Sequence, residues 1–233
     1  YLGQRKAVLF GGALLAAGHS LMAVEGVGGQ SDPTINVFWA ALAFIIVGSG
    51  FLKANISVMV GQLYKMTDIR RDGAYTVFYM GINVGAAIGT ILVGYLGQTI
   101  GWGWGFGLAG IGMLAGLVVF VLGKSALNGA GEAPAPLTKS KEWGLYGIGL
   151  ASVAVIWALV QYQDVIQSLL VISGVALLGY VLFESFKLEK EPRERMFAIL
   201  FLIALNPLFW GLFEQAGGSM SLFTDRYVDR GAT

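Results

Sequence analysis

Two ionisable side chains lie deep inside long apolar stretches of the sequence. Lys53 stands between GSGFL and ANISVMV, and Glu214 follows FWGLF. A charge at the centre of a bilayer costs about 2.5 to 3.5 kcal/mol on insertion scales, so such groups persist where they face a protein interior or a wet path. An ammonium there can hold a carboxylate, and a carboxyl group can take up and release a proton. The two residues are therefore candidates for ligand binding and proton transfer.

Polar and aromatic side chains recur near these two residues at four-residue intervals, which places each set on one face of a helix. The sets are Ser49, Lys53 and Ser57; Tyr75, Tyr79 and Asn83; and Asn206, Trp210 and Glu214. Hydroxyls and an amide on one face could hold a polar ligand, and Pro207 with the Gly217-Gly218 pair should let the last segment bend. The alternative for Lys53 is a structural ion pair with another helix.

The composition indicates the elements that must position these groups. The chain is 56% hydrophobic and 12% charged, against about 25% charged in an ordinary soluble domain. Its net charge of +1 argues against a nucleic-acid surface. With no cysteine and one histidine, the sequence indicates no disulfide, no metal and no cofactor. The sequence therefore predicts an all-α protein embedded in a lipid bilayer.

Seven apolar stretches approach the length of about 20 residues that crosses a bilayer. They cover residues 7–24, 37–64, 74–97, 104–123, 143–163, 166–186 and 197–221. Twelve of the fifteen Lys and Arg residues then fall in loops on one side, which marks that side as cytoplasmic. We therefore expect a multi-pass protein of the cell (inner) membrane whose first helix starts in the cytoplasm.

Breaks in the apolar pattern suggest how the chain is organised. Residues 124–142, KSALNGAGEAPAPLTKSKE, predict a cytoplasmic linker that acts as a hinge. An odd number of crossings and a start at Tyr1 suggest a fragment of a longer protein. On the third helix, Gly81, Gly85 and Gly89 are four residues apart, and such a small-residue stripe predicts a packing seam between helices.

Three segments resemble motifs of the proton-dependent oligopeptide transporter family, within the major facilitator superfamily: GSGFLKANISVMVGQLY, YTVFYMGINVGAA and FWGLFEQAGGS. The resemblance covers nearly the whole chain and implies the family's third to seventh helices, with the two extra helices of bacterial members. Residues 1–123 would be the latter part of the amino-terminal bundle and 124–142 the linker. Residues 143–186 would be the two extra helices, and 187–233 the first helix of the carboxy-terminal bundle.

The resemblance also implies a function: symport of protons with di- and tripeptides by alternating access, with no enzymatic activity. Lys53 matches the buried lysine associated with proton coupling and the peptide carboxylate, and Asn83 matches an asparagine that holds the peptide backbone. Trp210 matches a family residue that shapes a side-chain pocket, and Glu214 matches one that forms an ion pair with the opposite bundle. Tyr79 matches an aromatic position of a family motif. We expect the full-length chain to act as a monomer in the bilayer, with protons and small peptides as its partners.

Other classes of protein are compatible with parts of the pattern. A major facilitator carrier for nitrate, sugar or another small solute would also use a buried lysine. A purely structural membrane subunit would tolerate neutral residues at both charged positions. An intramembrane hydrolase could pair Lys53 with Ser49 or Ser57, but no oxyanion-hole arrangement is visible. One departure from the family concerns Ala54, where proline is common, so the bend beside Lys53 should be weaker here.

Overall fold

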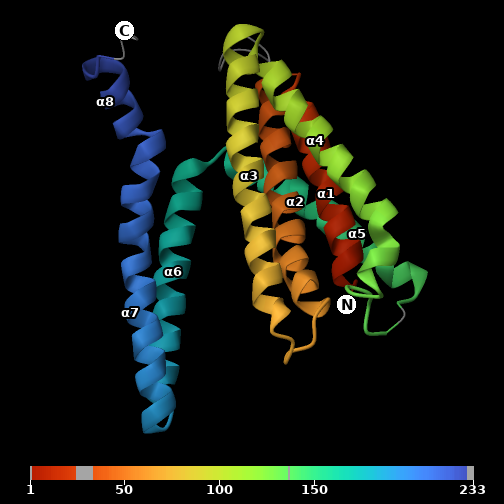
Figure 1. The fold of residues 1–233 in the computed structure, drawn as a ribbon. Coiled ribbons are helices and arrows are strands. Elements are labelled where there is room, and N and C mark those ends of the chain that lie inside the picture. Colours follow the sequence, from red (N-terminus) through yellow and green to blue (C-terminus); the bar gives the residue numbers. More distant parts are fainter. Residues whose placement is uncertain (1, 25–33, 136, 230–233) are drawn as a thin grey trace. The chain divides into compact units, whose positions relative to one another are not determined.

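The computed structural model describes residues 2–24, 34–135 and 137–229 (Figure 1). These residues form helices and connecting turns, and no strand occurs among them. The α-helices are α1 Gln4–Met22, α2 Ile35–Gln62, α3 Arg70–Thr99, α4 Trp102–Leu122, α5 Lys139–Val160, α6 Gln163–Ser185, α7 Lys190–Phe213 and α8 Ser219–Tyr227. Two 3-10 turns, η2 Gly123–Leu127 and η3 Glu214–Gly217, follow α4 and α7.

The predicted all-α membrane fold is confirmed. Six helical stretches of the described chain are long and apolar enough to cross a membrane, the last running from Lys190 to Tyr227. The first six expected crossings each lie mainly in one helix, whereas the seventh, 197–221, runs through α7, η3 and the start of α8. Helix α1 is not among the six stretches because its polar first turn and its His19-Ser20 pair lower its mean hydropathy. As expected from Ala54, α2 continues without a break past Lys53.

The chain divides into two compact units, residues 1–163 and residues 164–233. The expected domain limits do not coincide with this division. The two helices of 143–186 belong to different units, since α5 packs with α2 in the first unit while α6 lies in the second. Their grouping as an extra pair stays a prediction.

Helix α1 forms the centre of the first unit, where it packs against α2 and α4. Its contact with α2 is close because glycines face each other there. A methyl group on Gly11 would lie 2.6 Å from the carbonyl oxygen of Gly48, and one on Gly48 would lie 2.7 Å from that of Gly11. Backbone approach of this kind drives helix association in lipid, where the hydrophobic effect does not.

The seam predicted on the third helix is not formed within the described chain. A methyl group on Gly81, Gly85 or Gly89 of α3 would meet no described atom within 4 Å. Close packing occurs instead at other glycines, among them Gly11 of α1 and Gly48 of α2. Periodic glycines show that a helix can be approached closely, but only the partner helix decides whether it is.

Helix α5 completes the first unit by packing on α1 and α2. Its Val153 lies in a buried cluster with Leu14 of α1 and Ala43 of α2. Gly149 of α5 lies against the rings of Phe10 and Phe51, since a methyl group on it would be 2.6 Å from the first ring and 3.4 Å from the second. These apolar contacts explain why α5 belongs to the unit of α1 to α4.

The second unit holds α6, α7, η3 and α8. Phe186, just after α6, contacts Phe197 of α7 at a centroid distance of 5.5 Å. Helix α7 runs through Pro207 and ends at Phe213, after which the backbone tightens into η3. Gly218 separates η3 from α8 with φ −112° and ψ −108°. The bend expected at the glycine pair is therefore present, whereas Pro207 lies within a continuous helix.

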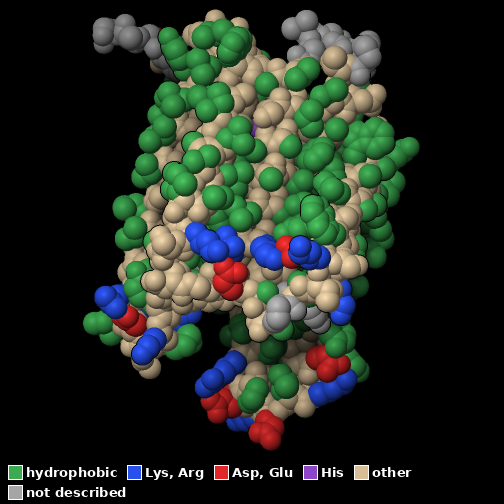
Figure 2. Space-filling model, turned by 90° about the vertical axis from the view of Figure 1, so that its right-hand side faces the viewer, with side chains coloured by type: hydrophobic (Ala, Val, Ile, Leu, Met, Phe, Trp, Pro, Cys, Tyr) green, Lys and Arg blue, Asp and Glu red, His purple; other side chains and the backbone are tan. Residues whose placement is uncertain are grey.

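Surface chemistry agrees with a membrane-embedded chain. On the face drawn in Figure 2, hydrophobic side chains cover wide areas, and the charged side chains gather in a few groups. Many large hydrophobic residues of α3, α6 and α7 are more than half exposed. Apolar exposure on this scale indicates contact with lipid or with further protein.

Candidate functional site

Lys53 lies on a face of α2 that no described helix of the first unit covers. The opposite side of α2 faces α1 through Ala41 and Gly48, which are both buried. Lys53 itself is exposed, as are Ile46 and Gly50 before it on the same face. Within the described ranges, no salt bridge to Lys53 is formed, so the structural ion pair considered above is not made there. The ammonium is open to a partner.

The two serines predicted to share this face differ in their surroundings. The Ser57 hydroxyl donates a hydrogen bond of 3.3 Å to the carbonyl oxygen of Lys53, one turn earlier in α2. Ser49 is only half-exposed. A hydroxyl that donates to its own helix is not placed as a nucleophile activated by the lysine amine. The serine-lysine hydrolase hypothesis therefore gains no support from this geometry.

The polar stripe of α3 divides into a packing part and an open part. Tyr75 is half-buried, and its hydroxyl would clash with a methyl group on Gly61 of α2. Tyr79 is 67% exposed, and Asn83 is also exposed. The Asn83 side-chain amide donates one N–H to the Tyr79 carbonyl oxygen in a 2.9 Å hydrogen bond, and its second N–H and its oxygen can still bind a ligand. Tyr75 is thus a packing residue, while Tyr79 and Asn83 face outward.

The contact between Gly61 and Tyr75 sets the register of α2 against α3. These helices follow each other through a short loop and contact each other, running antiparallel (Figure 1). Lys53 lies eight residues before Gly61, and Asn83 lies eight residues after Tyr75. At 1.5 Å per residue, both are about 12 Å from the contact. The fold therefore brings Lys53 and Asn83 to the same level along the bundle.

Trp210 and Glu214 lie in the second unit, at the end of α7. The Trp210 ring is 47% exposed and contacts the rings of Phe209 and Phe213 at centroid distances of 5.4 and 5.5 Å. Glu214 is exposed and occupies the first position of η3, where the α-helix ends. The carboxylate is thus carried by the break between α7 and α8 instead of by a regular helix.

The predicted site residues therefore fall into two groups, one in each unit. Lys53, Tyr79 and Asn83 belong to the first unit, and Trp210 and Glu214 belong to the second. The sequence alone did not reveal the contact between Gly61 and Tyr75 that sets the register of α2 against α3. A glycine near the end of the second helix could have indicated that another side chain packs closely there. It also did not show that Glu214 lies just beyond the end of the α-helix.

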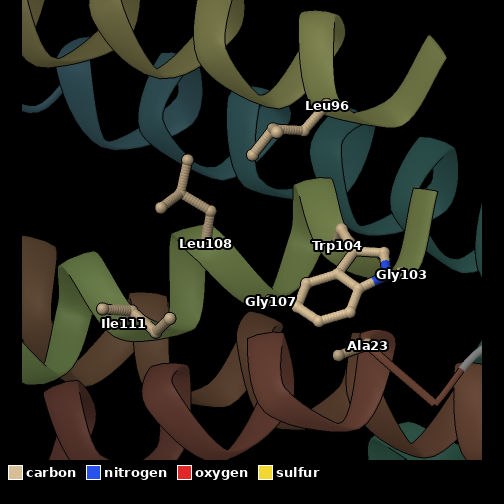
Figure 3. Close-up of a pocket in the computed structure, with 7 residues that line it drawn as sticks. All are labelled: Ala23, Leu96, Gly103, Trp104, Gly107, Leu108 and Ile111. Atoms are coloured by element: carbon tan, nitrogen blue, oxygen red, sulfur yellow. The ribbon is translucent and has the colours of Figure 1, made fainter. Parts of the chain in front are cut away.

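A cavity in the first unit lies away from these residues (Figure 3). It has a volume of about 480 Å³ and is enclosed by parts of α3 and α4 and by the residue that follows α1. Its lining is Ala23, Leu96, Gly103, Trp104, Gly107, Leu108 and Ile111. Such a lining offers nothing to the charged ends of a peptide, so the cavity is not the predicted polar site.

Metal chemistry has no obvious place in the described ranges. Among those residues, no group of three or more His, Asp or Glu side chains could hold a metal ion. The charged groups that do meet there form ion pairs near helix ends, such as Lys187 with Glu184 at 2.6 Å. The candidate chemistry therefore remains that of Lys53 and Glu214.

Six helical stretches of the described chain that are long and apolar enough to cross a membrane define a multi-pass α-helical membrane protein. The solved structures that it resembles place its fold in the major facilitator type. The chain belongs to the POT family, the proton-dependent oligopeptide transporters. The model of that family matches residues 5–233. The family resemblance noted in the sequence is thus confirmed.

Two curated relatives have names that state what they carry. The chain is 37% identical, over an alignment of 250 residues, to the peptide transporter YePEPT of Yersinia enterocolitica subsp. palearctica serotype O:3 (strain YE-P4), with 99% of this chain and 48% of the relative covered. It is 31% identical over 224 residues to dipeptide and tripeptide permease B of Aliivibrio fischeri (strain MJ11), covering 95% and 44%. The chain therefore spans about half the length of the curated relatives it matches.

Solved structures agree with this assignment. A crystal structure of the peptide transporter POT in complex with sulfate matches with a TM-score of 0.75 and 33% identity, covering 97% of this chain and 47% of that one. A bacterial homologue of the human drug peptide transporters PepT1 and PepT2 matches with a TM-score of 0.79 and 27% identity, covering 97% and 49%. The fold of this chain is that of about half of such a transporter.

Proposed function

We propose that the whole protein containing this chain is a proton-coupled symporter that imports di- and tripeptides by alternating access. The observation that carries the proposal is the placement of Lys53 and Asn83, which lie uncovered at one level of two adjoining apolar helices. A cation and an amide so placed suit the carboxylate and backbone of a short peptide. Membership of the POT family and the names of its relatives support peptide as the substrate.

Each candidate residue has a part in this proposal. The Lys53 ammonium pairs with the peptide carboxylate, the Asn83 amide bonds to the peptide backbone, and Tyr79 lies one turn from Asn83. Trp210 supplies an aromatic wall to a side-chain pocket. Glu214 forms an ion pair with the opposite bundle and breaks it on protonation. Its position at the end of α7 supports this role, because a helix break can change direction at small cost.

Coupling follows from these roles. A ligand shifts a conformational equilibrium only by binding its states with different affinity. Peptide bound at Lys53 and a proton bound at Glu214 each stabilise the conformation in which the ion pair between Glu214 and the opposite bundle is broken. We further propose that the protein resides in the inner membrane as a monomer, with its basic loops in the cytoplasm and no enzymatic activity.

Uptake by the whole protein in liposomes tests the proposal. We expect labelled dialanine to accumulate under an inward proton gradient and not without one. Lys53→Ala should weaken peptide affinity by about 10- to 150-fold, since hydrogen bonds to charged groups contribute about 1.5 to 3 kcal/mol. Lys65→Ala, which removes an exposed loop lysine, is the matched control and should keep full uptake. Movement of nitrate or sugar in place of dialanine would overturn the substrate, and unchanged uptake in Lys53→Ala would overturn the site.

Glu214→Gln tests the coupling separately. This variant should still exchange peptide across the membrane, but gradient-driven accumulation should fall because the side chain no longer binds and releases a proton. Glu194→Gln, an exposed change on α7, is the control for loss of charge. Equal accumulation by Glu214→Gln and the parent, at equal insertion, would refute the role of Glu214.

A further inference from the structure

The segment between α4 and α5 does not have the geometry of a free tether. After η2, three of its residues have left-handed backbone conformations: Asn128 with φ 47°, Gly129 with φ 84° and Gly131 with φ 79°. Backbone nitrogens in this stretch donate back to nearby carbonyls, Ala130 to Leu127 at 2.8 Å. Residues 128–133, here called the clasp, therefore form a compact turn.

Hydrogen bonds attach the clasp to the start of α1 and the end of α2. The Gly131 amide donates to the Gln62 side-chain oxygen at 2.8 Å, and the Arg5 amide donates to the Gly131 carbonyl at 2.9 Å. The Arg5 guanidinium also pairs with Glu132, with 2.8 Å between Nε and Oε1. Both backbone polar groups of the buried Gly131 are thus satisfied by other elements.

Packing at the clasp is as close as the hydrogen bonds imply. A methyl group on Gly131 would lie 2.8 Å from Cε of Met59 and 3.0 Å from the Arg5 nitrogen. Met59 is 2% exposed, so the clasp covers one of the most buried side chains of α2. By contrast, a methyl group on Gly129 would meet nothing within 4 Å. Gly131, unlike Gly129, is therefore a point of close attachment.

A second attachment joins the first turn of α5 to α1. The Lys6 ammonium lies 2.7 Å from Oε2 of Glu142, and the Tyr146 hydroxyl donates to Oε1 of the same carboxylate at 3.3 Å. The Tyr146 ring in turn contacts Phe10 of α1 at a centroid distance of 5.0 Å. The connection is therefore held at the clasp and again at the beginning of α5.

We propose that the clasp is a permanent strap: it binds the connection between α4 and α5 to the ends of α1 and α2, so that α5 moves with the first unit as one body. On this proposal, residues 128–133 are held in place and do not act as the hinge that the sequence predicts within 124–142. These attachments between helices do not depend on which solute the protein carries.

Hydrogen exchange at the Gly131 amide of the whole protein tests the strap. In the parent we expect this amide to exchange slowly, and Gln62→Leu should accelerate it about tenfold by removing the acceptor. Gln62→Glu keeps an acceptor oxygen and should retain slow exchange. Gln98→Leu makes the same change at an exposed site on α3 and serves as the control. Fast exchange in the parent, or no acceleration in Gln62→Leu, would overturn the proposal.

A second measurement needs no variant and so does not depend on whether a variant folds. A carbodiimide joins a lysine amine directly to a carboxyl group only when the two are in contact. We expect mass spectrometry of the treated parent to find Lys6 linked to Glu142. Absence of that link, while Lys187 is linked to Glu184 in the same sample, would overturn the strap. Neither measurement involves transport, so failure of the proposed function would leave both results interpretable.

Discussion

Replacing Gly48 by alanine should separate the two central helices of the first unit. The new methyl group would lie 2.7 Å from the Gly11 carbonyl oxygen and 2.9 Å from the Leu15 nitrogen, whereas ordinary contacts begin at 3.4 Å. Both nearest atoms belong to the backbone of α1, so no side-chain rotation can relieve the clash. Helix α1 would have to move by about 0.7 Å, and overpacking of this kind costs about 1 to 3 kcal/mol.

Gly85→Ala provides the matched control for this prediction. A methyl group on Gly85 meets no described atom within 4 Å, so only the helix propensity changes there, in favour of alanine by up to about 1 kcal/mol. That gain is common to both variants, and their difference isolates the steric cost. If the steric cost is about 2 kcal/mol, the ratio of folded to unfolded protein should be roughly 30-fold lower for Gly48→Ala than for Gly85→Ala under matched conditions.

Unfolding by SDS in detergent micelles, followed by tryptophan fluorescence, would measure the difference. The double variant Gly11→Ala, Gly48→Ala should lose less than the sum of the single losses, because the first methyl group already moves the helices apart. Equal stability of Gly48→Ala and Gly85→Ala would refute the close α1–α2 contact.

Two further outcomes follow from the loop between α2 and α3 and from the core of α2. Hydrogen bonds from the Arg70 side chain and backbone hold the pKa of Asp68 down, from 3.8 to about 2. The ionised Asp68 therefore contributes to stability above pH 4, and this contribution is lost as the pH falls through 2. Asp68→Asn should make stability fall less steeply with decreasing pH in the acid range. An unchanged dependence of stability on pH would contradict this. Met59→Ala should cost about 2 to 5 kcal/mol because Met59 is 2% exposed. Met80→Ala, at 58% exposure on α3, is the control for Met59 and should cost little in the same assay.

Much of the fold could be predicted from the sequence, because the bilayer imposes simple rules. Lipid offers no hydrogen-bonding partner to the backbone, so long apolar runs must form helices. The residues that interrupt those runs, such as Lys53 and Glu214, were visible as candidates for the same reason. The family motifs around Lys53, Asn83 and Trp210 then identified the family, which the comparisons confirmed.

The pairing of helices could not be predicted in this way. The glycines of α3 and those of α1 and α2 look alike in the sequence, yet Gly11 and Gly48 approach the backbone of the facing helix, whereas Gly81, Gly85 and Gly89 meet no described atom within 4 Å. The connection between α4 and α5 has the composition of a linker, but Gln62 and Arg5, far away in the chain, hold it in place. The order of apolar and polar residues along the chain determines which segments become helices and which polar groups are costly to bury. Contacts between distant segments depend on shape and on partner atoms, so only the tertiary structure decided the α1–α2 seam, the common level of Lys53 and Asn83, and the clasp.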